Sequence, residues 1–115
     1  MEFHQHGNSY EMLAKMPTKN SVAEVAGLFG LVSDPTRLKV LWLLCHMEMC
    51  VNNVGAALNM SAPAVSHHLR LLKQEGMIEA RRIGKEIHYR LSDKPAAKLL
   101  HKFIDDMFEM CCHND

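Results

Sequence analysis

The sequence has no long hydrophobic run: its apolar stretches, such as Val40 to Cys45, are far too short to span a bilayer. The N-terminus, MEFHQHGNSY, lacks the basic segment followed by an apolar segment that marks a secretory signal. We therefore expect a cytoplasmic protein without a membrane partner. The chain also has no formal net charge, because 13 Lys and Arg balance 13 Asp and Glu. That balance by itself argues against a general nucleic-acid binder.

Motifs of the common enzyme classes are missing as well. There is no glycine-rich phosphate loop, no Ser-His-Asp set and no pair of carboxylates suited to a cleft. A Cys–His nucleophile needs a formed pocket, for which 115 residues leave little room. Because 48% of the residues are hydrophobic, we expect one folded domain with a modest core, and not an enzyme.

The most informative stretch is Ser61 to Leu72, SAPAVSHHLRLL, which predicts a helix over about residues 62–75. Ser61 is a suitable N-cap, and Pro63 fits the first turn because its missing N–H costs nothing there. The inward stripe at three-to-four spacing consists of Val65, Leu69 and Leu72, with His68 beside it as a half-buried, hydrogen-bonded residue.

The segments on either side complete a DNA-binding pattern. An apolar helix is expected over residues 51–58, and Asn59 after it tolerates the left-handed backbone of a tight turn. A basic hairpin, the wing at about residues 77–91, follows with Gly84-Lys85 as its two-residue turn. We predict a mainly α fold with a small β-hairpin, a winged helix-turn-helix whose second helix enters the major groove of double-stranded operator DNA.

The outer face of that helix and the tip of the wing carry side chains that meet bases and phosphates. Within residues 61–90 basic residues outnumber acidic ones, whereas acidic residues gather near the C-terminus. The residues expected to contact DNA are Ser61, Ala62, Pro63, Ser66, His67, Arg70, Lys73, Arg81, Arg82, Lys85 and Arg90.

Helices are also expected before and after these elements. Residues 1–20 predict a flexible arm or a short first helix, and residues 21–115 the winged domain. Ser21 and Glu24 form a capping box for one helix. Asp34 caps the next, which begins at Pro35 and has the expected buried stripe Leu38, Leu41, Trp42 and Cys45.

A last helix is expected over about residues 95–112. Its apolar stripe is too broad for a solvated terminal helix: Leu99, Leu100, Phe103, Ile104, Met107, Phe108 and Cys111. Such a stripe needs a partner, and a second copy of the chain is the simplest one. We therefore expect a homodimer that packs through this last helix.

The four cysteines, Cys45, Cys50, Cys111 and Cys112, are candidate sensor residues because a cytosolic chain does not use them as a disulfide framework. Thiolates prefer soft partners; three suit arsenite, and four ligands including His46 or His113 suit cadmium or zinc. The same thiols could instead form a disulfide or polysulfide. For Cys45, a role as a small buried hydrophobe is about equally favoured. His101 with Asp105 one turn on is another candidate ligand pair, although a plain dimer-interface role is favoured for it.

Four motifs carry a resemblance to a known family: SDPTRLKVLWLL (Ser33 to Leu44), EMCVNNV (Glu48 to Val54), NMSAPAVSHHLRLLKQEGMI (Asn59 to Ile78) and RRIGKEIHYRLSD (Arg81 to Asp93). Over about residues 21–112 the chain resembles the ArsR/SmtB family of bacterial repressors. The resemblance implies a repressor that is dimeric through its first and last helices and that needs no cofactor to bind DNA. It also implies release by a metal ion, arsenite or a thiol oxidant.

The sensor positions of that family match only in part. Where many members carry two cysteines, this chain keeps Cys50 and has Asn52 in place of the second. The metal positions of the last helix lack both imidazoles here, and the weaker candidates that remain are Asp93, Asp106, Glu109, His101 and His113. Relatives that sense reactive sulfur imply pairing of Cys45 or Cys50 with Cys111 or Cys112, although the first cysteine of their pattern falls at Trp42. A winged-helix interaction module without an inducer is a further alternative.

Overall fold

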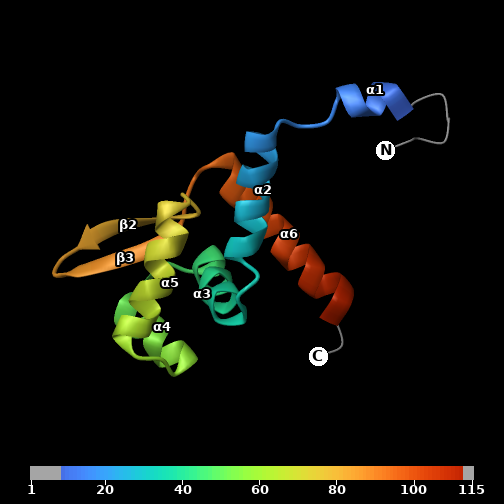
Figure 1. The fold of residues 1–115 in the computed structure, drawn as a ribbon. Helices are drawn as coiled ribbons and strands as arrows, with labels where there is room; N and C mark the ends of the chain where they lie inside the picture. Colours follow the sequence, from blue (N-terminus) through green and yellow to red (C-terminus); the bar gives the residue numbers. More distant parts are fainter. Residues whose placement is uncertain (1–8, 113–115) are drawn as a thin grey trace.

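The computed structural model describes residues 9–112, so residues 1–8 of the expected arm and the candidate ligand His113 lie outside the described part. The chain order is α1 Ser9–Ala14, α2 Lys19–Leu31, α3 Pro35–His46, β1 Met49–Cys50, α4 Val51–Leu58, α5 Ala62–Gln74, β2 Ile78–Ile83, β3 Glu86–Leu91 and α6 Pro95–Cys112. The fold is mainly helical with a small sheet, as predicted. Short α1 lies apart from the body, whereas α2 and α6 lie beside each other (Figure 1).

Local capping determines where the helices begin. Asp34 caps α3 as predicted, because its carboxylate accepts a hydrogen bond from the Arg37 N–H at 2.8 Å. The capping box predicted at Ser21 is wrong: α2 begins at Lys19, and the Thr18 hydroxyl accepts a hydrogen bond from the backbone N–H of Ser21 at 3.1 Å. The Thr18 hydroxyl thus accepts from the Ser21 N–H, which the predicted capping box would have paired with the Glu24 side chain.

The wing is one strand larger than predicted. β2 and β3 pair antiparallel around Gly84-Lys85, with Ile83 opposite Glu86, and Gly84 adopts the positive φ of 64° that this turn requires. The two-residue strand β1 adds to the other edge of β3, so the sheet order is β1-β3-β2. Because β1 directly precedes α4, this pairing joins the wing to the helix-turn-helix.

The core lies between α3, α4, α5 and the base of the wing. Its fully buried side chains are Val40, Leu41, Leu44, Val54, Val65, Leu69 and Leu72. The stripe predicted for α5 is therefore confirmed. The stripe predicted for α3 is partly wrong: Trp42 is 39% exposed, and Val40 and Leu44 take the buried positions beside Leu41. Contacts of α3 with several neighbours broaden its buried face beyond a single stripe.

Gly55 in α4 allows the two helices of the helix-turn-helix to meet closely. A Cβ at Gly55 would lie only 2.7 Å from the carbonyl oxygen of Met60, in the turn before α5. The Met60 N–H also donates a hydrogen bond to the Gly55 carbonyl at 2.9 Å. Asn59, in the left-handed conformation with φ 54°, completes this turn as the sequence predicted.

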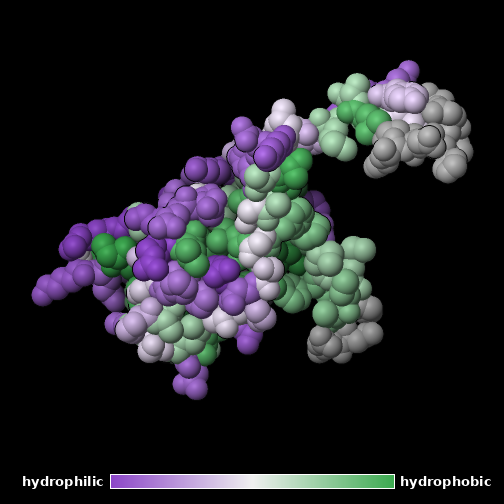
Figure 2. Space-filling model, in the orientation of Figure 1, coloured by the Kyte–Doolittle hydropathy of each residue, from purple (hydrophilic) through white to green (hydrophobic). Residues whose placement is uncertain are grey.

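A broad apolar surface remains exposed along α2 and α6. Phe29 and Phe103 meet edge to face there, with ring centroids 6.2 Å apart. The exposed apolar side chains of this surface, the α2–α6 face, are Val22, Val25, Phe29, Leu99, Phe103, Met107 and Phe108. Figure 2 shows hydrophobic colours along these helices and hydrophilic ones over α5 and the wing. None of the helices in the described part is long and apolar enough to cross a membrane.

Replacing Gly55 with alanine tests how much the fold depends on this contact. The new methyl group must displace the Met60 carbonyl, so we expect the free energy of unfolding in urea to fall by about 1–3 kcal/mol. The matched control is Gly27→Ala on α2, where a Cβ meets nothing within 4 Å. That variant should gain roughly 0.5–1 kcal/mol, because alanine is the better helix former. Equal stability of the Gly55→Ala variant and the native chain would contradict the close contact.

Candidate nucleic-acid interface and sensor residues

The outer face of α5 is a polar surface on a rigidly held helix. Val65, Leu69 and Leu72 anchor one side of α5 in the core, which leaves the side chains at the intervening positions exposed. The exposed residues on this face are Ala62, Pro63, Ser66, His67, Arg70 and Lys73. Arg70 Nη2 lies 3.1 Å from His67 Nδ1, so the two side chains present donors and acceptors together.

The first turn of α5 is arranged as the sequence predicted. The Ser61 hydroxyl accepts a hydrogen bond from the Ala64 N–H at 3.3 Å, and Pro63 occupies the first turn. Pro63 has no N–H, and the Val65 N–H donates to the Ser61 carbonyl, so the Ala62 N–H is the one left at the positive end of the helix dipole in this turn. Such an end favours a phosphate oxygen, which suits the start of a helix that approaches DNA.

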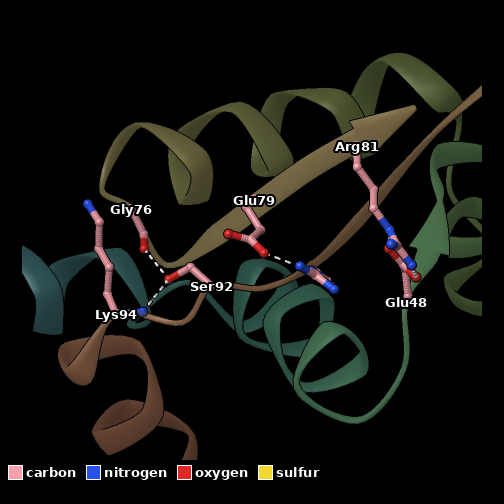
Figure 3. A network of polar contacts seen from close by, with 7 residues as sticks. Glu48, Gly76, Glu79, Arg81, Ser92 and Lys94 are labelled. Atoms are coloured by element: carbon pink, nitrogen blue, oxygen red, sulfur yellow. Dashed lines mark hydrogen bonds and ion pairs between the residues drawn. The ribbon is translucent and has the colours of Figure 1, made fainter. Parts of the chain in front are cut away.

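The basic residues of the wing divide into two classes. Arg81 forms a bidentate ion pair with Glu48, with Nε–Oε1 and Nη2–Oε2 distances of 2.6 and 2.8 Å (Figure 3). This pairing holds the pKa of Glu48 below its usual value. Arg90 pairs with Glu79 at 2.7 Å. The expectation that Arg81 and Arg90 hold phosphates stays a prediction, but each already has a carboxylate partner, Glu48 before β1 and Glu79 in β2.

Arg82 and Lys85 differ from these two arginines. Both are exposed near the tip of the hairpin, and neither forms an ion pair with any residue of the described range 9–112. The positive charge available for phosphates on this side is thus concentrated on Arg82 and Lys85 together with Arg70 and Lys73 of α5. The sequence showed the cations but could not show Glu48 as a partner, because Glu48 comes from the loop before β1.

His68 is a half-buried residue of α5 that lies near Asp34 and Arg37 at the start of α3. Its Nδ1 is buried and has no hydrogen-bond partner within residues 9–112, so the hydrogen bond expected for that nitrogen is absent. Burial lowers the pKa of His68, and the charges of Arg37 and His67 act in the same direction against the opposing effect of Asp34. Folding therefore disfavours the protonated form of this ring.

Comparisons with known proteins agree with this geometry. The family described as "Bacterial regulatory protein, arsR family" matches residues 34–80. A Synechocystis transcriptional repressor SmtB homolog is 34% identical over 86 residues, 75% of this chain and 65% of its own length. A Staphylococcus aureus cadmium resistance transcriptional regulatory protein, a CadC homolog, is 35% identical over 98 residues, 84% of this chain and 81% of the relative. The chain belongs to the ArsR family of bacterial regulatory proteins. The family consists of regulators, which confirms that the chain is not an enzyme.

Solved structures place the same fold in this family. The antimony-specific transcriptional repressor AntR is 31% identical with a TM-score of 0.71, and the match covers 84% of this chain and 87% of AntR. A Mycobacterium bovis homodimeric winged helix-turn-helix DNA-binding domain matches with a TM-score of 0.70 at 24% identity, covering 100% of this chain and 97% of that domain. The predicted winged helix-turn-helix is thereby confirmed.

The four cysteines of this ArsR-family chain lie in different environments. Cys45 on α3 is half-buried, and burial, with a smaller effect from the charge of Asp105, raises the pKa of its thiol to about 12. Cys50 is 5% exposed at the end of β1, where it is opposite His88 in the sheet. Cys111 and Cys112 are exposed in the last turn of α6. Among the described residues, the fully exposed cysteines are therefore the two at the end of α6.

The structure does not gather these thiols into one site within a chain. Cys111 and Cys112 line a hollow with Val32 and Leu38, near the start of α3, whereas Cys50 follows the end of α3. The 12 residues of α3 separate its two ends by about 17 Å at 1.5 Å per residue. One ion cannot span that distance, because its ligands lie about 2.3 Å away.

The other candidate ligands are also dispersed. Asp106 is paired with Lys102 at 2.7 Å, and Glu109 is exposed one turn further on. Asp93 precedes α6, at the opposite end of that helix from Glu109. His101, by contrast, lies 2.9 Å from Asp105, and its ring meets that of His46 with centroids 5.0 Å apart. His46, which the sequence offered only as an accessory ligand, therefore belongs with the His101–Asp105 pair.

The lowered pKa of His68 predicts a stability effect in acid. The unfolded chain binds a proton near the ordinary histidine pKa of about 6.5, whereas the folded chain binds it only at lower pH. The stability gained by keeping the ring neutral is therefore present above that value and lost as the pH falls through the lowered pKa. Urea unfolding between pH about 7.5 and about 5 should show less loss for His68→Gln than for the native chain. His88→Gln on the wing is the control, and equal slopes for the native chain and His68→Gln would contradict this assignment.

Proposed function

We propose that this chain is a homodimeric cytoplasmic repressor that binds a palindromic operator and releases it when a thiophilic metal or metalloid ion binds Cys111 and Cys112. In this proposal α5 enters the major groove, and the wing lies along flanking phosphates. The observation that carries DNA binding is the outer face of α5. Ser66, His67, Arg70 and Lys73 are exposed there, opposite a fully buried stripe, and Arg70 and Lys73 have no acidic partner within residues 9–112.

The α2–α6 face supports dimerisation. Seven large apolar side chains are exposed on two adjacent helices, which is a larger cluster than a monomer leaves in water. A second copy covers the same face isologously, and the homodimeric Mycobacterium bovis domain has the same fold. Dimerisation also doubles the positive surface of α5 and the wing, which offsets the absence of net charge.

The inducer assignment follows from the exposure of the thiols and from the relatives. Cadmium and antimony, which appear in the relatives' names, are soft acceptors that prefer thiolate ligands. Two adjacent thiols on α6 provide part of a trigonal arsenite site or of a tetrahedral cadmium or zinc site. Because α6 contributes to the α2–α6 face, the corresponding thiols of a second copy can complete the ligand set. Oxidation of the same exposed pair is the second candidate, since redox sensing also requires accessible thiols.

The DNA-binding part is tested by the double variant His67→Ala/Arg70→Ala. Loss of each base contact should cost about 1–3 kcal/mol, so we expect at least a tenfold weaker affinity for the chain's own upstream DNA in fluorescence anisotropy at fixed salt. Lys102→Ala is the charge control, because Lys102 is exposed on α6 and is paired with Asp106. If all three proteins bind alike, the face of α5 does not read DNA and a protein-interaction module becomes the better proposal.

The inducer part is tested with the fully reduced protein on the same DNA, titrated first with arsenite and then with cadmium. We expect release near stoichiometric ligand for the native chain and retention of DNA by the variant Cys111→Ser/Cys112→Ser. Cys50→Ser is the matched control and should respond like the native chain, because Cys50 is buried away from the end of α6. Unchanged anisotropy of the native chain would remove the metal assignment and leave thiol oxidation.

A further inference from the structure

A second constellation of metal-ligating side chains joins α3 to α6, away from the exposed cysteines. His46 is the last residue of α3, and His101 and Asp105 lie one turn apart on the same side of α6. Their donor atoms all lie within 4.8 Å of one another. Within residues 9–112, these are the three side chains that bring potential metal-ligand atoms this close together, and none of them is a cysteine.

Both imidazoles present the same nitrogen to one carboxylate. His46 Nε2 lies 3.2 Å from Asp105 Oδ1, and His101 Nε2 lies 2.9 Å from Asp105 Oδ2. The two rings are nearly perpendicular, at 88°, so they approach the carboxylate from different directions. Ligands that surround a bound ion approach it from different directions in this way. A simple ion pair with one carboxylate would need only one imidazole.

The nitrogen of His101 gives a second, independent indication. His101 Nε2 is buried and has no hydrogen-bond partner in residues 9–112, even though Asp105 Oδ2 is so near. The ring is therefore not oriented to donate a proton to that oxygen. A buried nitrogen without a partner is costly, and a bound cation would satisfy it through its lone pair.

We propose that His46, His101 and Asp105 form a binding site for a divalent transition-metal ion of the zinc, cobalt and nickel class. Two imidazoles and one carboxylate match the borderline preference of these ions, whereas arsenite and cadmium favour thiolates. At metal–ligand distances of about 2.0–2.2 Å, tetrahedral ligand atoms lie roughly 3.3 Å apart, close to the two separations already present. Three protein ligands leave a position for water or for a donor of a second copy.

An ion bound at this site would link the end of α3 to α6. α3 leads through β1 into α4 and α5, which carry the candidate DNA surface, whereas α6 carries much of the α2–α6 face. An ion held by His46 and Asp105 therefore fixes the orientation of the DNA-reading half relative to the dimer face. This regulatory consequence rests on the function proposed above, but the binding of the ion does not.

Cobalt(II) is the probe that tests the site directly. We expect reduced native protein to bind one Co²⁺ per chain, with visible d–d absorption and no near-ultraviolet charge-transfer band from thiolate, and added Zn²⁺ should displace it. His46→Gln and His101→Gln should each weaken binding beyond the roughly 10–100-fold that loss of a supporting partner causes. His67→Gln and Cys111→Ser/Cys112→Ser are the controls and should bind as the native chain does. Circular dichroism of each variant without metal establishes that it is folded.

The outcomes separate this site from the inducer assignment at the cysteines. Native-like Co²⁺ affinity in folded His46→Gln or His101→Gln, a thiolate band, or no stoichiometric binding by the native chain would overturn the site. Anisotropy on operator DNA with Co²⁺ or Zn²⁺ then tests the regulatory part. If binding is lost in the histidine variants but DNA affinity never responds to the ion, the site stands and the regulatory consequence is overturned. Release by arsenite does not depend on either result.

Discussion

The burial of one side of α5 is the interaction on which the rest of the structure depends. Val65, Leu69 and Leu72 are almost completely removed from water, so the rotation of this helix about its own axis is fixed. That rotation alone decides which side chains face solvent at the helix-turn-helix. Gly55 then sets how closely α4 approaches, because any larger residue would meet the Met60 carbonyl. The same buried residues therefore stabilise the fold and determine which face of α5 is exposed as the candidate DNA surface.

Ion pairs within the protein reduce the positive charge that the wing can offer to DNA. The wing contains three arginines and a lysine, but Arg81 and Arg90 are neutralised by carboxylates from the sheet and its adjoining loop. Exposed pairs of this kind contribute little to stability, yet they orient the strands and reduce the charge available to phosphates. Each copy therefore offers few unpaired cations to DNA. A dimer that places two such surfaces on one duplex compensates for this, since each neutralised phosphate releases counterions.

Local sequence signals were sufficient for much of the fold. The caps at Asp34 and Ser61, the left-handed Asn59 and the Gly84-Lys85 turn depend on a few neighbouring residues, and all were predictable. The strand β1 was not, because two residues show no periodicity and pair only once β3 is in place. The exposure of Trp42 and the Arg81–Glu48 pair likewise depend on tertiary contacts. His46 joins His101 and Asp105 only after α3 packs against α6, which no spacing along the chain indicates.

Both candidate effector sites involve α6, and this has a physical reason. α5 is anchored in the core by Val65, Leu69 and Leu72 and has little freedom to respond, whereas the 18 residues of α6 bury only Ala97 and Ile104. Its position relative to α3 therefore depends on weak intramolecular packing and on the partner across the α2–α6 face. An ion that binds one arrangement of α6 better than another shifts the dimer by that difference in affinity, typically about 1–3 kcal/mol. A sensor placed on this sparsely buried helix thus needs to supply less free energy than one placed beneath α5.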